Sequence, residues 1–458
     1  MSSEDLKKTR KYSVVEGSFA SVASGAGDSY IVPYALALNA NNAHIGMLSS
    51  LGGILGPISQ IFGSRLIEKF ERKKIVLLFV ALQASMWLMF ILAGLLFLKS
   101  FFPEYIIPFL ITVYISYIVL GSVASPSWFS MMGDVVPEKI RGKYFSRRNK
   151  INGGISLAVT LLAALWLDHL GKTNLVIIGF ISLFAISAFG RFMSAYYFTK
   201  HSPPKLKLEK GYYFSFFQFI KKAPFNNFGR FAIFVALITL TMNIAGPFYA
   251  VYMLKELQFS YVWFTIINMS AGIVSISFIP FWGHFADKYG NRELLRITSM
   301  ALPFLPLLWI FSPSPIYLIL VPQLLGGLAW GGFNLAASNF IYDAVTSQRR
   351  GIVVAYYSML NGFGVFIGAG IGAVLAQYVN LKFINTFFFL FIIAGFSSAI
   401  VIFSLISKLK EVRQEVHPPN KNPFTYLREA RPIFGVVKFR SNPLSSFRLI
   451  SRKKKIKR

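Results

Sequence analysis

Long apolar stretches recur along almost the whole of this chain, and a sequence of that kind has few ways to fold. Each stretch has roughly 20–26 residues, enough to cross a hydrocarbon core about 30 Å thick. Because every backbone amide in that core must find its partner inside the protein, such stretches form helices, and the alternating pattern of a membrane barrel is absent. We therefore predict an all-α membrane protein whose twelve transmembrane helices cover residues 13–38, 43–67, 75–98, 105–133, 151–170, 174–198, 229–254, 261–286, 294–312, 315–341, 353–378 and 383–406.

The composition excludes a soluble fold. Hydrophobic residues make up 55% of the 458 residues and charged residues only 14%, whereas globular domains carry about 25% charged residues. The first residues lack the short apolar segment and the small-residue cleavage site of a secretory signal. We therefore expect the first helix to be retained and to direct its own insertion.

Basic residues alternate from one loop to the next. Of the 47 Lys and Arg residues, 28 lie on the N-terminal side and on every second loop, and 15 lie in the C-terminal tail. The remaining loops hold four, namely Lys99, Lys172, Lys255 and Lys382. By the positive-inside rule, both termini lie in the cytoplasm, the protein spans the cell membrane many times, and the number of helices is even. The net charge of +29 is thus explained without nucleic acid, and the polybasic tail suits anionic lipid of the inner leaflet.

The chain contains an internal repeat. At one offset of 209, five positions of the first half recur in the second: Asp134, Arg141, Gly142, Asn152 and Gly153 match Asp343, Arg350, Gly351, Asn361 and Gly362. The helices at 13–38 and 229–254 match more loosely, through Pro33 and Pro247. We predict two pseudo-symmetric six-helix bundles, 1–198 and 229–407, with a cytoplasmic linker at 199–228 and a basic cytoplasmic tail at 408–458. Paired bundles of this kind are a transporter design, with the binding site between the halves near the midplane.

Two loops resemble those of a known family. The first has Gly283, Asp287, Lys288, Gly290 and Arg292 at the spacing of the motif G-x-x-x-D-(R/K)-x-G-x-(R/K) of the major facilitator superfamily. The segment at 134–149 is similar to that superfamily's loop between helices 4 and 5. The resemblance covers about residues 13–406. It implies a twelve-helix transporter that works by alternating access, and it does not identify the solute.

The residue types of the motif loop suggest a conformational latch. Gly283 and Gly290 would let the backbone turn tightly and neighbouring helices approach, while Asp287 would face a helix N-terminus and Arg292 a carboxylate. Such contacts would exist only while the cytoplasmic ends of the helices are together, and would bias the equilibrium between outward-open and inward-open states. The full predicted latch is Gly283, Asp287, Lys288, Gly290, Arg292, Glu68, Asp134, Arg141, Asp343 and Arg350. Alternatively, these charges only fix loop topology. The first-half loop departs from the motif, since Glu68 replaces the expected Asp and Glu71 stands where Gly is expected.

Asp28 is the acidic residue placed deepest in a predicted span. It lies midway along the helix at 13–38, between Gly27 and Ser29. A charge in the bilayer costs about 2.5–3.5 kcal/mol on insertion scales, so ionisable residues there are functional candidates. We expect Asp28 to bind a proton, or a cationic or hydroxylated solute. The alternative is a structural carboxylate bonded to Ser29 or to a neighbouring helix.

Other polar and aromatic residues are candidates for the solute path. These are Ser29, Tyr30, Tyr34, Asn243, Tyr249, Gln323 and Asn334, with Gln60, Gln83 and Asn268 also at mid-depth. Neutral amides also join helices in membranes, and aromatic residues are 16% of the chain, so packing is the alternative for each. Glu16 and Arg191 lie near the predicted cytoplasmic ends of their helices, where snorkelling or pairing at the interface would explain them.

The remaining motifs narrow the function. The chain has no cysteine, its five histidines are scattered, and no phosphate-binding Gly-rich loop is present. We therefore expect no metal, no cofactor, no ATP-driven step and no enzyme activity. The predicted function is secondary active transport of a small solute, as symport or antiport, coupled to protons, by a protein favoured to be a monomer. A membrane sensor that binds a ligand without transporting it is the alternative.

Overall fold

The computed structural model describes residues 3–202, 204, 215–344, 347–379 and 384–412, and it contains helices and no strand in these ranges. The first bundle consists of α1 (Ser3–Ala26), α2 (Ile31–Ala37), α3 (Asn42–Leu66), α4 (Arg72–Leu98), α5 (Pro103–Val135), α6 (Glu138–Gly171) and α7 (Val176–Thr199). The short α8 (Phe216–Lys222) lies in the linker.

The second bundle repeats this plan. It consists of α9 (Asn227–Ala245), α10 (Phe248–Val251), α11 (Tyr261–Tyr289), α12 (Asn291–Ala301), α13 (Phe304–Leu308), α14 (Pro315–Leu318), α15 (Leu324–Ala344), α16 (Ser347–Tyr378) and α17 (Thr386–Leu405). In the described residues, 10 helical segments are long and apolar enough to cross a membrane. The two other predicted spans are the interrupted pairs α1–α2 and α12–α13. The predicted all-α fold of two six-helix bundles is thus confirmed.

Proline interrupts the first helix of each bundle at a related place. Pro33 lacks an N–H and its ring crowds the carbonyl four residues earlier, so a regular helix cannot run through this point. A 3-10 turn at Asp28–Tyr30 separates α1 from α2. In the second bundle α9 ends at Ala245, just before Pro247, and α10 follows. The repeat therefore preserves a break in the membrane-spanning part of both helices.

Several helices extend beyond their predicted spans. The first helix begins at Ser3 rather than at residue 13, and α6 begins at Glu138 rather than at 151. Those boundaries are wrong because apolar character marks the part of a helix that lies in lipid, whereas the polar continuation is stabilised by packing on other helices. The predicted starts at 105, 229 and 261 agree within two residues with α5, α9 and α11.

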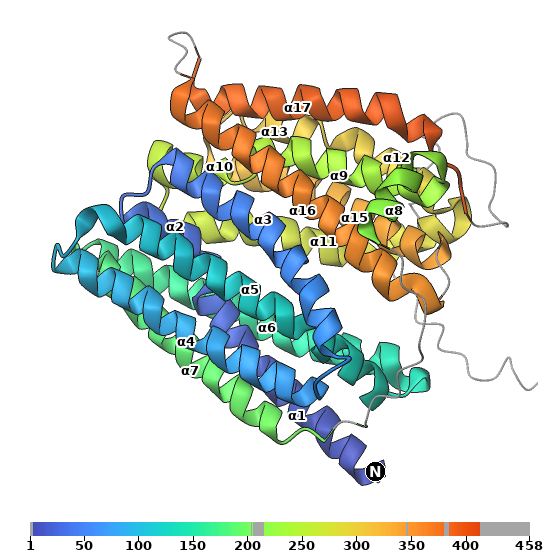
Figure 1. The fold of residues 1–458 in the computed structure, drawn as a ribbon. Coiled ribbons are helices and arrows are strands. Elements are labelled where there is room, and N and C mark those ends of the chain that lie inside the picture. Colours follow the sequence, from blue (N-terminus) through green and yellow to red (C-terminus); the bar gives the residue numbers. More distant parts are fainter. Residues whose placement is uncertain (1–2, 203, 205–214, 345–346, 380–383, 413–458) are drawn as a thin grey trace, which may run out of the picture.

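The bundles share one apolar core on one side and separate on the other. The start of α1, α8 and the end of α17 lie at one end of the molecule, here called the termini side, and the opposite end is the far side (Figure 1). A buried cluster in the middle and on the far side joins residues of both bundles, among them Tyr30 and Phe248. Toward the termini side the two larger clusters are separate, one around Met131 in the first bundle and one around Phe333 in the second, and a small cluster at α8 includes Ile61 of α3. The helices of the two bundles accordingly diverge toward the termini side (Figure 1).

Glycines bring α3 and α16 into close contact across the two bundles. A Cβ at Gly46 would lie 2.2 Å from the Cβ of Ala373, and one at Gly362 would lie 2.5 Å from the Gly53 carbonyl. The other glycines of α16, Gly364, Gly368 and Gly372, pack instead on the backbone of α9 inside the second bundle. Small residues thus let backbones meet both between and within bundles.

The linker and the tail are described only at their roots. In α8, Phe216 and Phe219 pack against Tyr356, and Ile61 of α3 belongs to the same cluster. After α17, Leu409 is buried and Lys410 exchanges two hydrogen bonds with Asn227. The predicted lipid-binding part of the tail, 413–458, and most of the basic linker segment, 205–214, lie outside the described residues.

Candidate functional site

A cavity of about 810 Å³ lies among helices of the first bundle. All 18 residues that line it belong to that bundle, and they come from α1, the turn after it, the start of α2, and α3, α4, α5 and α7. Its size is within the range of small-molecule sites. Polar groups at its wall are Ser24, Asp28, Gln60, Gln83, Tyr114, Tyr117, Ser122, Ser125 and Arg191.

Helical spacing brings these groups onto one wall. On α5, Tyr114, Tyr117, Gly121 and Ser125 recur every three or four residues, which puts them on one helix face. On α1 the lining residues also follow this spacing and end at Asp28. The break after Gly27 then turns the chain, and a Cβ at Gly27 would lie 2.2 Å from the Trp87 ring. Glycine is thus needed for this turn to rest directly on α4.

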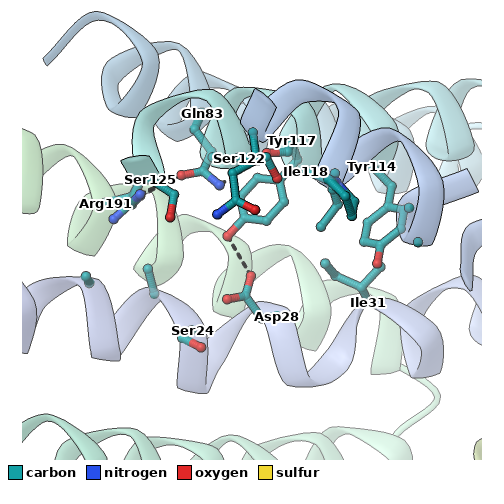
Figure 2. Close-up of a pocket in the computed structure, with 18 residues that line it drawn as sticks. Ser24, Asp28, Ile31, Gln83, Tyr114, Tyr117, Ile118, Ser122, Ser125 and Arg191 are labelled. Atoms are coloured by element: carbon teal, nitrogen blue, oxygen red, sulfur yellow. Dashed lines mark hydrogen bonds between the residues drawn. The ribbon is translucent and has the colours of Figure 1, made fainter. Parts of the chain in front are cut away.

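Asp28 lies at the break and faces the cavity. Its carboxylate accepts a hydrogen bond of 2.6 Å from the Tyr117 hydroxyl (Figure 2). The side chain is exposed to the cavity although the surrounding helices enclose it. Ser24 of α1 also hydrogen-bonds to this carboxylate. A carboxylate with only neutral partners and access to the cavity is able to exchange a proton or to bind a cation.

Arg191 of α7 lies in the same cavity. Its Nε and one terminal nitrogen donate to Gln83 Oε1 at 3.0 and 2.6 Å, and Gln83 Nε2 donates to the Tyr117 carbonyl at 3.1 Å. The sequence-based assignment of Arg191 to the membrane interface is therefore wrong. The reason is that α7 faces the cavity at this position, so a charge near the helix end points inward to a polar wall and not outward to lipid headgroups.

Most of the other predicted solute-path residues do not line this cavity. Gln60 and Gln83, named at mid-depth, line it with Asp28, whereas the other seven predicted binding residues, all of them described, do not. Tyr34 is fully buried, donates to the Phe90 carbonyl at 2.9 Å and packs on Phe184. Tyr249 stacks on Phe391 in the second bundle. Both tyrosines are therefore part of the packed core, where the Tyr34 hydroxyl has a partner.

Ser29 and Asn334 are exposed at other surfaces, and Gln323 ends a π-helical turn before α15. Asn243 donates to the Thr239 carbonyl of its own helix at 2.8 Å. Tyr30 is buried between the bundles, where its hydroxyl donates to the Thr160 carbonyl and lies 3.0 Å from the Thr265 hydroxyl. Tyr30 is thus a contact between bundles.

Further polar contacts close the far side. Asp168 of α6 accepts hydrogen bonds from the backbone N–H groups of Tyr261 and Val262, at 2.6 and 3.1 Å, and so caps the N-terminus of α11 from the other bundle. Lys255 donates to the Ala40 carbonyl at 2.7 Å. Nearer the middle, Ser50 donates to the Phe366 carbonyl at 2.7 Å. A solute leaving toward the far side would have to break these contacts.

Two predicted latch residues lie in matching contacts of the two bundles. Arg72, the first residue of α4, donates to Asp134 at 2.7 Å and to Ser130 at 2.9 Å. Asn291, the first residue of α12, donates to Asp343 at 2.6 Å and accepts from Asn339 at 3.1 Å. The partners Ser130 and Asn339, like Asp134 and Asp343, differ by the offset of 209. The repeat is therefore structural as well as sequential.

The motif loop has one conformation that requires glycine. Gly290 has φ of 89° between α11 and α12, a region that glycine adopts without strain. Gly283 lies inside α11, and a Cβ there would meet no atom within 4 Å, so the expected turn and close approach at this residue are not found. The Arg292 backbone N–H donates to Glu411 at 2.8 Å.

The remaining latch residues are less fully described. Glu68 and Asp287 are exposed, and Lys288 lies 5.0 Å from the ring of Tyr289. The side chains of Arg141 and Arg350 lie outside the described part of the chain.

A second buried charge pair lies on the termini side of the first bundle. Arg148 and Glu16 are 3.4 Å apart, with side chains 11% and 8% exposed. Ser194 donates to the same carboxylate at 3.2 Å, and Arg148 Nε donates to the Ser13 carbonyl at 3.1 Å. Glu16 is thus paired, as expected, although inside the bundle and not at its surface. These bonds join α1, α6 and α7.

Fold and cavity together define a class: a multi-pass membrane protein of two related bundles, built as transporters are. A model of the Major Facilitator Superfamily matches residues 17–231 and, a second time, residues 231–454. The chain belongs to this family of transporters.

Individual relatives are distant. Vacuolar basic amino acid transporter 2 of Saccharomyces cerevisiae is 28% identical over 157 residues, 34% of this chain and 32% of that protein. Multidrug resistance protein MdtG of Salmonella choleraesuis is 26% identical over 170 residues, 36% of this chain and 39% of that protein. The chain thus matches about a third of the length of these relatives.

Solved structures show the same fold. The nucleoside transporter NupG has a TM-score of 0.66 at 18% identity, covering 88% of this chain and 100% of that chain. A bacterial homologue of the iron transporter ferroportin, in an inward-facing state, has a TM-score of 0.65 at 15% identity, covering 89% of this chain and 100% of that chain.

Proposed function

We propose that this protein carries a small solute across the cell membrane by alternating access, as a secondary transporter coupled to protons through Asp28. The observation that carries the proposal is the cavity with one carboxylate at the break of its first helix, which is held by two neutral side-chain partners, the hydroxyls of Tyr117 and Ser24. The relatives' names include an amino acid, drugs, a nucleoside and a sugar. They therefore support transport and leave the solute open.

The contacts between the bundles support alternating access. The shared core and the capping of α11 by Asp168 close the far side, while the separate cores leave the bundles apart toward the termini side. The loop charges favour a cytoplasmic location for both termini. With that orientation, the state described here faces the cytoplasm, and the opposite state requires the far-side contacts to break.

We also propose that the charged positions on the termini side act as the latch of the other state. In the present state Asp134 and Asp343 are bonded to the first residues of α4 and α12 within their own bundles. These contacts fix the ends of the helices that would meet when the termini side closes. The protein is proposed to act as a monomer, since each bundle contributes its own half of this arrangement.

The test is a flux assay in proteoliposomes under an imposed pH gradient. It measures the uptake of radiolabelled amino acids, nucleosides, sugars and cationic drugs. The Asp28→Asn variant removes the proton-accepting group and keeps the size of the side chain, so gradient-driven flux of the accepted solute should fall by about 100-fold or more. Glu104→Gln, at an exposed position at the start of α5, is the matched control and should keep full flux. Unchanged flux and pH dependence in Asp28→Asn would remove the coupling role. A solute that binds without ever being moved would favour a ligand sensor.

A further inference from the structure

Two opposite charges line the cavity without pairing with each other. Asp28 accepts hydrogen bonds from Tyr117 and Ser24, and Arg191 gives two bonds to Gln83. Among the described residues, no ion pair within 4.0 Å includes either charge. Both side chains point into the same space (Figure 2). An acid and a base in one cavity usually neutralise each other, so their separation requires a cause.

The cause is a neutral chain of hydrogen bonds between them. Gln83 accepts from Arg191 and donates to the Tyr117 carbonyl, and Tyr117 donates through its hydroxyl to Asp28. The amide of Gln83 is pressed against α5, since a Cβ at Gly121 would lie 2.3 Å from Gln83 Nε2. Because this amide is tightly packed, Arg191 and the Tyr117 backbone keep their places. The two charges are thus held apart by Gln83 and Tyr117, whose uncharged groups neutralise neither Asp28 nor Arg191.

Each charge therefore keeps positions open for a ligand. Withdrawing a charge from water is costly unless an opposite charge or several hydrogen bonds replace the water. A cation bound at Asp28 would be repelled by Arg191 and would leave the charge of Arg191 uncompensated. An anion bound at Arg191 would be repelled by Asp28 and would leave the charge of Asp28 uncompensated. A ligand that brings both an ammonium group and a carboxylate satisfies both sides at once.

The rest of the wall is apolar. Tyr114, Ile118 and Ile31 lie together on the side of the cavity away from Arg191 (Figure 2). Gly52 and Gly56 of α3 lie close to Tyr114 and Ile118 respectively, since a Cβ at either glycine would be 3.3 Å from that side chain. The space of about 810 Å³ exceeds what two charged groups alone would fill. A ligand with an apolar body beyond its charged end matches this arrangement.

We propose that the cavity binds an amphoteric solute: a free amine held by Asp28, a free carboxylate held by Arg191, and an apolar body against Tyr114 and Ile118. This proposal rests on the proposed function, because it names the class of solute for the same site. It makes Arg191 a specificity-determining residue that reads the carboxylate, and Gln83 the residue that positions it.

The test compares three forms of one compound on the unmodified protein. Phenylalanine carries both charges, phenylalaninamide carries only the cation, and N-acetylphenylalanine carries only the anion. A second series is made in the same way from the dipeptide alanylphenylalanine, whose two charges lie farther apart. Binding is measured by calorimetry in detergent at neutral pH. In at least one series the doubly charged form should bind at least about tenfold more tightly than either blocked form, because each blocked form leaves one buried charge unsatisfied.

Two variants assign the charges. Arg191→Gln should bind the amide as well as the free acid, and Asp28→Asn should bind the N-acetyl form as well as the free amine. Lys99→Gln, an exposed position after α4, should keep the tenfold preference. Equal binding of the cation-only form, or no binding in either series, would overturn the proposal.

Flux measurements on the same compounds separate this proposal from the proposed function. Movement of all forms alike, stopped by Asp28→Asn, would leave proton-coupled transport standing and overturn the amphoteric class. Tight binding that needs both charges, without flux under any gradient, would support the amphoteric site and contradict transport.

Discussion

The two bundles share their geometry and differ in where their charges lie. Each interrupts its first helix next to a proline, and each ties the first residue of its third crossing segment to an aspartate, Asp134 or Asp343. Asn152 and Asn361, also related by the repeat, both accept a hydroxyl bond of 3.4 Å from the first segment of their own bundle. Duplication thus preserved the helix breaks and the hydrogen bonds that hold the helices of each bundle together.

The chemistry, in contrast, is concentrated in the first bundle. Its interior holds Asp28 and Arg191 at the cavity and the pair Glu16–Arg148 below it. At related places the second bundle has the amide Asn243, bonded to its own helix, and Tyr357 in place of Arg148. The second bundle has a buried carboxylate of its own, Glu293, but it is paired with Arg296. Under the proposed function, the first bundle carries the groups that bind and exchange protons, and the second lacks them at the related positions.

The largest expected effect comes from moving the carboxylate to the second bundle. In the double variant Asp28→Asn, Asn243→Asp, flux driven by a pH gradient should stay about 100-fold or more below that of the unmodified chain. The reason is that Asn243 bonds to the Thr239 carbonyl and has no counterpart of Tyr117 or Arg191 beside it. Recovery to within tenfold in the proteoliposome assay would show that the bundles are interchangeable.

The next effect concerns the buried pair of the first bundle. Glu16→Gln leaves Arg148 without its carboxylate at 11% exposure, and breaking such a pair costs about 3–5 kcal/mol. Tyr357→Phe, at the related position of the second bundle, removes one hydroxyl bond to Asn361 and should cost only about 1 kcal/mol. Both are measured by unfolding in mixed micelles. The double variant Glu16→Leu, Arg148→Met should recover most of the loss, and equal losses in the two bundles would contradict the comparison.

A smaller difference is expected between Arg72 and Asn291. Arg72→Asn gives the first bundle the chemistry of the second, and the loss of a charged bond to Asp134 should cost about 2 kcal/mol. Asn291→Ala removes neutral donors and should cost about 1 kcal/mol. The same unfolding assay compares them. A greater loss of stability in Asn291→Ala than in Arg72→Asn would mean that the amide of Asn291 makes the stronger of the two contacts.

The smallest effect depends on pH. His201, just after α7, is fully buried, and this burial, with the nearby charges of Lys73 and Arg148, lowers its pKa from 6.5 to about 4. The unfolded chain therefore takes up the proton first, so that stability is complete above pH 6.5 and falls as the pH drops toward 4.

The expected loss at pH 5.5 is about 1 kcal/mol. His201→Leu keeps a large side chain at this buried position and has no group that titrates, so it should remove this pH dependence. Hydrogen exchange at residues 198–202 between pH 7 and 5.5 is the measurement. Equal pH dependence in the unmodified chain and in His201→Leu would assign the effect to other groups.

The sequence predicted the class, the helices and the repeat because apolar length and an offset of 209 are properties of the chain alone. It also identified Asp28, since a lone carboxylate deep in a span is costly wherever it points. It missed the partners of that carboxylate. The structural alternative offered Ser29 or a neighbouring helix as the partner, and Tyr117 was not identified because it is one of many aromatic residues.

Arg191 was missed for a different reason. A basic residue near a helix end fits the rule for cytoplasmic charge, and the direction in which it points depends on how α7 packs. One signal was available: polar and aromatic residues recur every three or four positions from Tyr114 to Ser125, which marks a wall that faces something other than lipid. The contact of Arg72 with Asp134 joins residues 62 positions apart, and only the packing of α4 on α5 reveals it.

The two faces of α3 have a consequence for how this protein could diversify. Gly52 and Gly56 line the cavity, Gly46 rests on α16 of the other bundle, and Gly53 does both. In the proposed transport cycle, one face of α3 contacts the solute and the other face contacts the second bundle. Natural variation at the face of α3 that lines the cavity would change which solute binds. The face that rests on α16 is constrained by the backbone that it contacts. New solute specificities can therefore arise without a change in the contact between the bundles.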